Sequence, residues 1–259
     1  VMRMNRIDER FAKVKADGRK ALITFLTVGD PNMEVSEKAI YTMQEEGVDL
    51  IELGVPFSDP AADGPVIQRA DERAIFKVFE LVRKIRNNVE VPMVFLLYYN
   101  VMVQYGIEKF FKCCQETGVD GLIIPDLPYE ESDEIKEYTE KYGVYQISLV
   151  SPTSKDRIKN IAKDAKGFLY CISSLGVTGE KSSFVTNFDE FVGTIKKYTD
   201  VPACVGFGVS NGRQVKELTK YFDGAIVGSA IVKSIATGES VEERINNLRE
   251  KIKDLKSGL

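Results

Sequence analysis

One stretch of the sequence indicates the fold most directly, and it reads Val48-Asp49-Leu50-Ile51-Glu52-Leu53-Gly54-Val55-Pro56. It is apolar at most positions and does not alternate with polar residues. A strand that is apolar on both faces is typical of a parallel sheet covered by helices. The stretch therefore predicts a buried parallel strand that carries a carboxylate, Glu52, in its interior.

The same pattern recurs along the whole chain. The other predicted strands span residues 21–29, 92–100, 121–128, 145–152, 167–174, 201–209 and 224–232. Segments with one polar face alternate with them and predict helices at residues 6–16, 32–46, 107–116, 130–141, 211–221 and 241–256. Because no Ser/Gly/Pro-rich linker interrupts the series, we expect residues 1–259 to form a single domain.

Eight predicted strand–helix units favour an α/β fold of the (β/α)8 TIM-barrel type, with an extra N-terminal helix. An open, doubly wound sheet is the alternative. No Gly-x-Gly-x-x-Gly turn follows the first strand, so the dinucleotide-binding form of that alternative loses support. In a barrel, chemistry is carried out at the carboxyl ends of the strands. The search for functional residues therefore narrows to those ends.

The composition excludes several classes of partner. The 35 Lys and Arg residues are balanced by 39 Asp and Glu residues, and no basic block is long enough to follow a nucleic-acid backbone. The apolar runs are far shorter than the ~20 residues that cross a bilayer, and the first residues do not continue into a signal peptide. We expect a soluble, cytoplasmic protein with no nucleic-acid or membrane partner.

The sequence contains no His, which removes the commonest general base, catalytic triads that depend on His, and imidazole ligands for metals. The four cysteines, Cys113, Cys114, Cys171 and Cys204, show no C-x-x-C spacing, so neither a zinc site nor a disulfide framework is predicted. Proton transfer must fall to Asp, Glu, Tyr, Lys or Cys.

Glu52 is the first candidate for that role. A charge inside an apolar strand is costly unless it is paired or serves a cavity. An internal ion pair is the alternative explanation, but the eight apolar strand cores contain no Lys or Arg. Burial should raise the pKa of Glu52 and favour a protonated form that acts as a general acid.

The loop after this strand contributes Asp59 and Asp63 among turn-forming residues. For either residue alone, a turn-capping role is the more common explanation. Paired with Glu52, a loop carboxylate can sit in a different environment, so that one group supplies acid and the other stabilises charge.

Glycines at three successive strand ends predict a phosphate site. They occur in Gly176-Val177-Thr178-Gly179, in Gly206-Phe207-Gly208 and in Gly228-Ser229. In barrels of this size, the loops after strands seven and eight commonly form such a cradle from backbone N–H groups. A single Gly-x-Gly is more often a simple turn, and the cradle here would use N–H groups and the Ser229 hydroxyl.

Four apolar or aromatic residues are ambiguous from strand context alone. Phe25, Leu96 and Ile123 fit an ordinary barrel core. Tyr170 could donate its hydroxyl to a ligand or be a core aromatic bonded to a backbone carbonyl.

The chain resembles the α subunits of tryptophan synthase. The resemblance rests first on Glu52-Leu53-Gly54-Val55-Pro56-Phe57-Ser58-Asp59-Pro60 and Ala62-Asp63-Gly64-Pro65, and it extends over essentially the whole sequence. Further matching motifs are Thr27-Val28-Gly29-Asp30-Pro31, Tyr98-Tyr99-Asn100, Pro125-Asp126-Leu127-Pro128, Gly176-Val177-Thr178-Gly179, Gly206-Phe207-Gly208-Val209 and Gly228-Ser229-Ala230-Ile231-Val232.

The resemblance implies a cofactor-free retro-aldol cleavage of indole-3-glycerol phosphate to indole and glyceraldehyde 3-phosphate, in L-tryptophan biosynthesis. It assigns the acid–base role to Glu52 and the stabilisation of the charged ring to Asp63, with Tyr170 in support. It places Phe25, Leu96 and Ile123 around the indole ring. The phosphate positions of the family correspond to Gly179, Gly208, Gly228 and Ser229, and Thr178 matches a threonine that meets the loop aspartate on closure.

The resemblance also implies a partner, a β subunit that carries pyridoxal phosphate, in an α2β2 complex. Docking would involve Pro56, Asp59 and Asn100. In one respect the chain departs from the family pattern, because only Ile75, Phe76 and Lys77 separate residues 68–74 from the helix at residues 78–81, where the family usually has several more residues.

Three alternatives stay open at this point. One is a stand-alone indole-releasing lyase that needs no β subunit. Another is a non-catalytic subunit that senses phosphate, against which the intact Glu52 and Asp63 argue. The third is a different phosphate-binding barrel, such as a sugar-phosphate isomerase; many of these use His clusters or a catalytic Lys.

Overall fold

The computed structural model describes residues 4–56, 65–173, 181–206 and 208–259, with the backbone alone for residues 65–71 and 181–186. The strands are β1 (Ala21–Thr27), β2 (Leu50–Gly54), β3 (Met93–Leu96), β4 (Gly121–Ile123), β5 (Tyr145–Gln146), β6 (Leu149–Val150), β7 (Leu169–Ile172), β8 (Ala203–Gly206) and β9 (Gly224–Val227). The α-helices are α1 (Arg6–Ala16), α2 (Met33–Glu45), α3 (Pro65–Ile85), α4 (Tyr99–Tyr105), α5 (Ile107–Thr117), α6 (Asp133–Tyr142), α7 (Arg157–Asp164), α8 (Lys181–Lys196), α9 (Gly212–Leu218), α10 (Ser229–Ala236) and α11 (Val241–Lys256). Short 3-10 helices occur at η1 (Arg86–Asn88), η2 (Tyr129–Glu131) and η3 (Pro152–Ser154).

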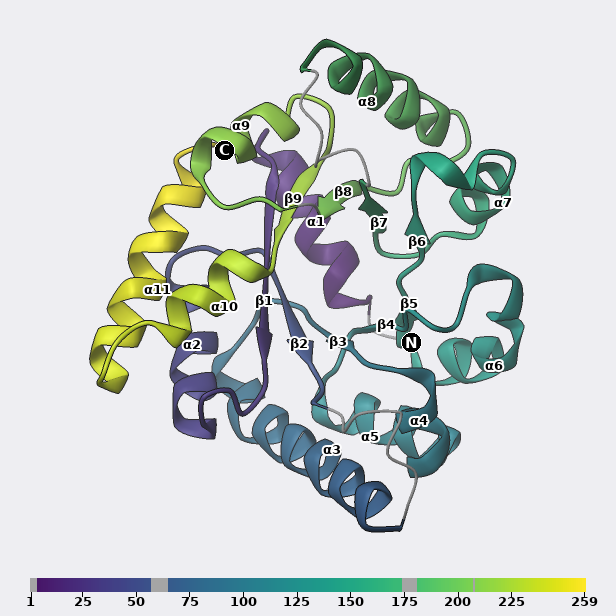
Figure 1. The fold of residues 1–259 in the computed structure, drawn as a ribbon. Coiled ribbons are helices and arrows are strands. Elements are labelled where there is room, and N and C mark those ends of the chain that lie inside the picture. Colours follow the sequence, from purple (N-terminus) through teal and green to yellow (C-terminus); the bar gives the residue numbers. More distant parts are fainter. Residues whose placement is uncertain (1–3, 57–64, 174–180, 207) are drawn as a thin grey trace.

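The strands form a parallel sheet in the order β5-β4-β3-β2-β1-β9-β8-β7-β6. Its two edge strands, β5 and β6, are consecutive pieces of one chain segment. Within that segment the Ile147 N–H donates to Leu122 O at 2.8 Å, and the Ser148 carbonyl accepts from Tyr170 N at 3.0 Å. The segment therefore closes the sheet into a barrel, which excludes the open doubly wound alternative and confirms the predicted TIM barrel. Figure 1 shows the helices around the strands.

The first and last predicted helices agree with α1 and α11 at both ends. The predicted strands were too long, because their carboxyl ends belong to loops or to the next helix; Tyr99 and Asn100 begin α4, for example. The predicted fifth strand is divided into β5 and β6. The short segment from Ile75 to Lys77, where the chain departs from the family pattern, lies inside the unbroken helix α3.

Helix starts follow from side-chain caps that the sequence supplies. The Asn32 side chain accepts from Val35 N at 3.0 Å, and Asn211 accepts from Gln214 N at 2.9 Å. The Ser240 hydroxyl accepts from Glu243 N at 3.1 Å at the start of α11. Such caps satisfy N–H groups that have no partner within the helix and stabilise it by about 1 kcal/mol each.

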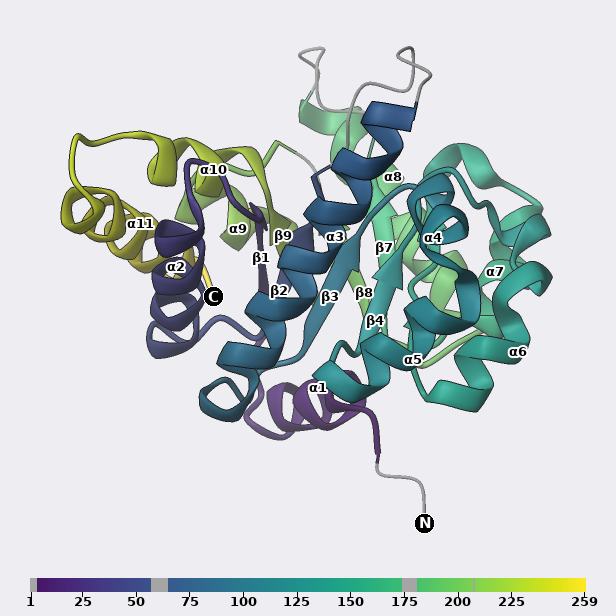
Figure 2. The same cartoon turned by 90° about the horizontal axis from the view of Figure 1, so that it is seen from below.

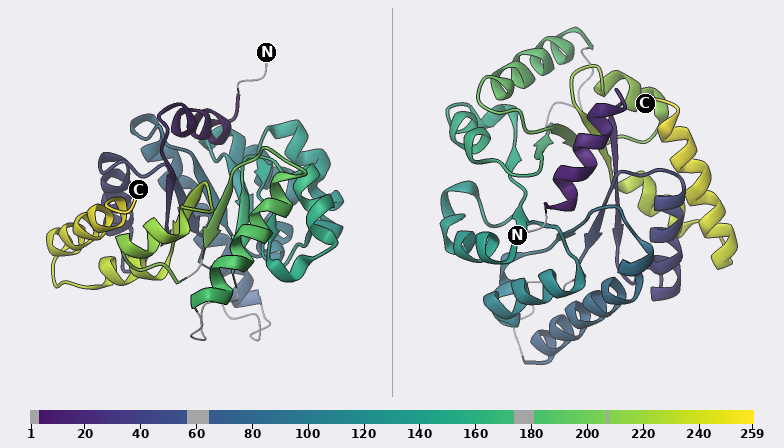
Figure 3. Two further views of the ribbon diagram at one scale, coloured as in Figure 1. Left: turned by 90° about the horizontal axis from the view of Figure 1, so that it is seen from above. Right: turned by 180° about the vertical axis from the view of Figure 1, so that it is seen from behind.

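Helix α1 covers the end of the barrel where the strands begin (Figures 2 and 3). Its apolar residues Ile7, Phe11 and Val14 belong to the same buried cluster as the inward-facing residues of the strands. The rings of Phe11 and Phe168 lie 5.6 Å apart between centroids. This end of the barrel is filled by side chains, so a ligand must enter from the opposite end.

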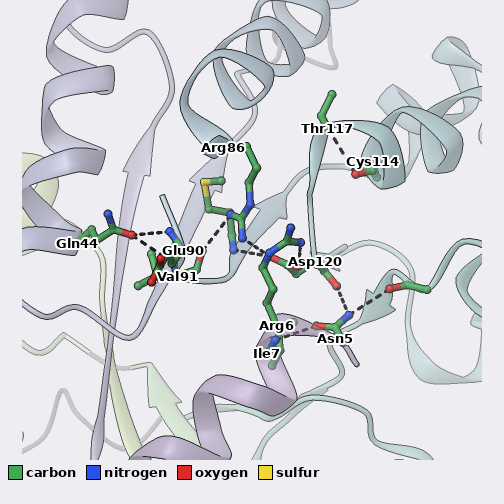
Figure 4. Close-up of polar contacts among 12 residues, drawn as sticks. Asn5, Arg6, Ile7, Gln44, Arg86, Glu90, Val91, Cys114, Thr117 and Asp120 are labelled. Atoms are coloured by element: carbon green, nitrogen blue, oxygen red, sulfur yellow. Dashed lines mark hydrogen bonds and ion pairs between the residues drawn. The ribbon is translucent and has the colours of Figure 1, made fainter. Parts of the chain in front are cut away.

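Two buried aspartates tie α1 to the first residues of the strands. Asp120 precedes β4, accepts from Arg6 at 2.9 Å and from Met93 N at 2.9 Å, and lies in the group drawn in Figure 4. Asp49 precedes β2, is 2.9 Å from Arg10 and 2.7 Å from Arg19, and accepts from Leu22 N at 2.9 Å. Breaking a buried pair of this kind by removing one partner costs about 3–5 kcal/mol. The buried charges at this end are thus paired and structural.

Candidate active site

Glu52 lies in the third position of β2, on the inward face of the barrel. Its neighbours in the sheet register are Phe25 on β1 and Val94 on β3. The side chain is 2% exposed, and among the described residues its Oε1 has no hydrogen-bond partner. Desolvation by burial raises the pKa of Glu52 from 4.5 to about 8. Near neutral pH this residue is therefore a carboxylic acid that still has a proton to give.

Tyr170 faces Glu52 across the interior. It lies on β7, which the sheet order separates from β2 by β1, β9 and β8. The pKa of Tyr170 is raised first by burial and then by the charge of Glu52, so the phenol stays protonated and can donate a hydrogen bond. The structure thus brings together two of the residues singled out in the sequence.

Two glycines make room for the aromatic side chains of this interior. A Cβ at Gly206 on β8 would lie 2.7 Å from the hydroxyl oxygen of Tyr170. A Cβ at Gly54 on β2 would lie 2.6 Å from Cζ of Phe25. Contacts this short do not occur between real side chains, so each ring occupies the space that a side chain would need. Sequence reasoning gave these glycines no such role.

The apolar candidates line the same interior. Ile123 on β4 is buried, and Leu96 on β3 is half-buried against the same cluster. They pair with each other in the register, and Leu96 also pairs with Gly54. Leu96 and Ile123 lie at the level of Gly54, two residues further toward the carboxyl ends of the strands than Glu52. Half-buried Phe25 is the register partner of Glu52 and extends this apolar wall to the level of the carboxyl.

One apolar residue at this end escaped the sequence reasoning. Ile172 ends β7, two positions after Tyr170 and therefore on the same face of the strand. It is 41% exposed, although it is a large apolar residue in a strand. The alternation within β7, with Tyr170 and Ile172 on one face, was the signal that could have identified it.

The structure places the described glycines of the predicted phosphate site at neighbouring strand ends. Gly208 follows β8, has φ +40°, and a Cβ there would meet nothing within 4 Å. Gly228 follows β9 and is the N-cap of α10. Because the first bonds of α10 join Ile231 N and Val232 N to the Gly228 carbonyl, the N–H groups of Ser229 and Ala230 precede the helical ladder. Such N–H groups and the positive end of a helix favour an anion.

Three predicted site residues, Asp63, Thr178 and Gly179, lie outside the described residues. In the parts of the chain that the structure describes, no three or more His, Cys, Asp or Glu side chains are grouped so that they could hold a metal ion. Nor is any helix there long and apolar enough to cross a membrane.

Comparisons with known proteins agree with this fold and identify the family. The family model described as tryptophan synthase alpha chain matches residues 11–259. A tryptophan synthase alpha chain from Thermoanaerobacter sp. (strain X514) is 47% identical over 262 residues, covering 99% of this chain and 100% of that protein. One from Methanocaldococcus jannaschii is 46% identical over 238 residues, with 89% of this chain and 84% of that protein covered.

Solved structures give the same answer. Tryptophan synthase from M. tuberculosis, in its aminoacrylate-bound form, includes a chain that superposes with a TM-score of 0.81 at 32% identity, over 98% of this chain and 99% of that one. Tryptophan synthase subunit alpha from Campylobacter jejuni superposes with a TM-score of 0.79 at 37% identity, over 91% and 95%. The chain therefore belongs to the tryptophan synthase alpha chain family, whose members are lyases.

Proposed function

We propose that this chain cleaves indole-3-glycerol phosphate to indole and glyceraldehyde 3-phosphate. The observation that carries the proposal is Glu52, a buried carboxyl with an unpartnered oxygen and a pKa raised to about 8. Breaking the bond between indole C3 and the side chain requires a proton on C3. A carboxylic acid that is protonated near neutral pH inside an apolar pocket is suited to deliver it.

In the proposed reaction, Glu52 donates its proton to indole C3 and becomes a carboxylate. The side-chain hydroxyl next to C3 then loses its proton, for which the Glu52 carboxylate is the acceptor. As the carbonyl of the aldehyde forms, the C–C bond breaks and its electron pair returns to the ring, which restores indole. Glu52 ends the cycle protonated, so the atoms and charges balance without a cofactor.

Protonation of C3 leaves positive charge on the ring nitrogen. We assign to Asp63 the role of accepting the ring N–H and stabilising that charge, as the family resemblance implies. Tyr170 supports the site as a hydrogen-bond donor, because its phenol stays protonated beside Glu52. The two carboxyl groups have different roles, because Glu52 must carry a proton whereas Asp63 must stay charged.

The rest of the pocket fits the two ends of this substrate. Phe25, Leu96 and Ile123 provide an apolar wall for the indole ring. The phosphate fits the strand ends at Gly208 and Gly228, where the start of α10 offers N–H groups and the Ser229 hydroxyl. We assign Thr178 and Gly179 to the same substrate on the strength of the family resemblance.

We further propose that the chain works with a β subunit, as its family name implies. That partner would hold pyridoxal phosphate, whereas this chain would need no cofactor of its own. The proposed docking residues are Pro56, Asp59 and Asn100. Of these, the structure describes Pro56, two residues after the end of β2, and Asn100, within α4.

The test is indole release from indole-3-glycerol phosphate by the purified chain, with and without a β subunit. Glu52→Gln should lower kcat about 10²–10⁴-fold, because an amide has no proton to give to carbon. Glu90→Gln, at an exposed site, is the matched control and should leave kcat unchanged. Near-normal kcat in Glu52→Gln would refute the assignment.

The same assay separates the alternatives. Full activity without a β subunit would indicate a stand-alone lyase. No activity under either condition, together with binding of glycerol 3-phosphate, would indicate a phosphate-sensing subunit.

A further inference from the structure

The ring of Phe25 lies across the neighbouring strand β2, next to Glu52. Phe25 and Glu52 are partners in the register of β1 and β2, so their side chains leave adjacent strands on the same inward face. The ring does not stay above its own strand, because its far edge occupies the space beside Gly54. A Cβ at Gly54 would lie 2.6 Å from Cζ and 2.8 Å from Cε2 of Phe25.

A second glycine borders the other end of the same side chain. A Cβ at Gly228 would lie 4.0 Å from Cβ and 4.0 Å from Cδ1 of Phe25, which is ordinary van der Waals contact. The two glycines therefore differ in the space that they leave for a side chain. Gly228 could accept a methyl group without moving Phe25, whereas Gly54 could not.

The ring lies beside a carboxyl that is almost completely buried. Phe25 is half-buried while Glu52 is 2% exposed. A side chain that separates a buried group from solvent is expected to be partly exposed itself. No hydrogen bond or ion pair opposes the desolvation of Glu52, since burial is the cause of its raised pKa and its Oε1 has no partner among the described residues.

We propose that Gly54 is a positioning residue, whose missing side chain lets the Phe25 ring lie against β2 and shield the Glu52 carboxyl from water. The inference rests on the proposed function in that Glu52 is the acid of the reaction. It adds that the protonated state of this acid is set by the shape of β1 and β2 before any substrate binds.

The other described groups near Glu52 do not stabilise its charged form. Val94, its partner on β3, is apolar and buried. Among the described residues, Tyr170 on β7 is a titratable side chain that interacts with Glu52, and its neutral phenol adds no charge. Asp49, which directly precedes β2, is paired with Arg10 and Arg19.

The experiment measures the Glu52 carboxyl in the free chain, without substrate. The chain is labelled with ¹³C at the side-chain carboxyl of glutamate, and the carboxyl resonances are followed from pH 5 to 9.5. The Glu52 resonance is identified by its absence in Glu52→Gln. We expect Gly54→Ala to displace the ring, admit water, and lower the pKa of Glu52 by about one pH unit or more.

The variant Phe25→Leu closes a double-mutant cycle. Removing the ring should lower the pKa of Glu52 by itself, and Gly54→Ala should then have no further effect, because the shorter side chain leaves room for the methyl group. If Gly54→Ala alone fails to fold, the double variant Gly54→Ala/Phe25→Leu avoids the clash. Its Glu52 pKa, compared with that of wild type, still shows the effect of removing the ring. Gly193→Ala, at an exposed helical glycine with nothing within 4 Å of the added carbon, controls for a Gly→Ala change as such.

Two results would overturn the proposal: an unchanged pKa in both Gly54→Ala and Phe25→Leu, or an equal effect of Gly54→Ala with and without the ring. Neither depends on enzymatic activity. If the resonance behaves as expected but Glu52→Gln still releases indole at the normal rate, the shield is correct and the proposed function is wrong.

Discussion

The pH dependence of stability offers a direct test of how Glu52 is buried. In the unfolded chain the pKa of Glu52 should be near the ordinary value of 4.5. In the folded chain, burial raises it to about 8. Between these two values the folded chain holds a proton that the unfolded chain has released. The free energy of unfolding must therefore fall as pH rises through this window, and the loss is complete above the folded pKa.

The size of the effect follows from the two pKa values. Each pH unit between them corresponds to about 1.4 kcal/mol, so the full window amounts to about 5 kcal/mol. Between pH 6 and pH 8.5, where the protein can be compared conveniently, the expected loss is about 2–3 kcal/mol. Glu52→Gln removes the titrating group while keeping the shape of the side chain.

The measurement is urea denaturation of the wild-type chain and Glu52→Gln at several pH values from 6 to 8.5. The variant should gain about 2–3 kcal/mol relative to wild type over this range, on top of any constant offset from burying an amide. Glu90→Gln, at an exposed position, controls for loss of a carboxyl. A constant difference between Glu52→Gln and wild type at every pH would show that Glu52 reaches water or a partner, and would refute the reasoning.

Three further predictions concern the rest of the site. Asp63→Asn should lower kcat strongly with a smaller effect on KM, because its charge matters after C3 is protonated; a change in KM alone would make Asp63 a binding residue. Gly206→Ala should lower kcat/KM by displacing Tyr170, since the added carbon would lie 2.7 Å from its hydroxyl oxygen, and Tyr170→Phe in the same steady-state assay separates loss of the hydroxyl from displacement of the ring. Ser229→Ala should weaken binding of glycerol 3-phosphate by about 1–3 kcal/mol in calorimetric titration, and unchanged affinity would place the phosphate elsewhere.

The order of elements could be predicted from the sequence because most strands are apolar without alternation and the helices between them have one polar face. Helices α1 and α11 were correct to the residue, since a cap at Asn5 and at Ser240 marks their starts. The strand ends were not correct, because apolar residues continue past the last strand residue into loops or into the next helix. Apolarity alone does not distinguish those two environments.

Closure of the barrel also lay beyond the sequence pattern. The fifth unit forms two short strands, β5 and β6, that each pair with a different neighbour. A count of eight units favours a barrel, but it is the hydrogen bonds of Ile147 and Ser148 that join the two edges.

The candidate site also has a part that the sequence predicts and a part that it does not. Glu52 could be identified because a carboxylate in an apolar strand stands out in the sequence alone. The fit of Gly54 to Phe25, and of Gly206 to Tyr170, depends on two strands at once. A glycine that makes room for a side chain on another strand leaves no local signal, since the same residue in a turn looks identical in the sequence.

Asp49 and Glu52 show how two buried acids in one short segment acquire different surroundings. Both are buried acids only three positions apart, and sequence reasoning about burial treats them alike. At the end covered by α1, Asp49 meets Arg10, Arg19 and the N–H of Leu22, so its charge is balanced and fixes the helix to the barrel. Further along the chain, Glu52 lies beside the ring of Phe25 and has no cationic partner among the described residues, so burial favours its protonated form. The environment of Glu52 therefore favours the proton that the proposed reaction needs, and supplying Glu52 with a cation would be expected to lower its pKa.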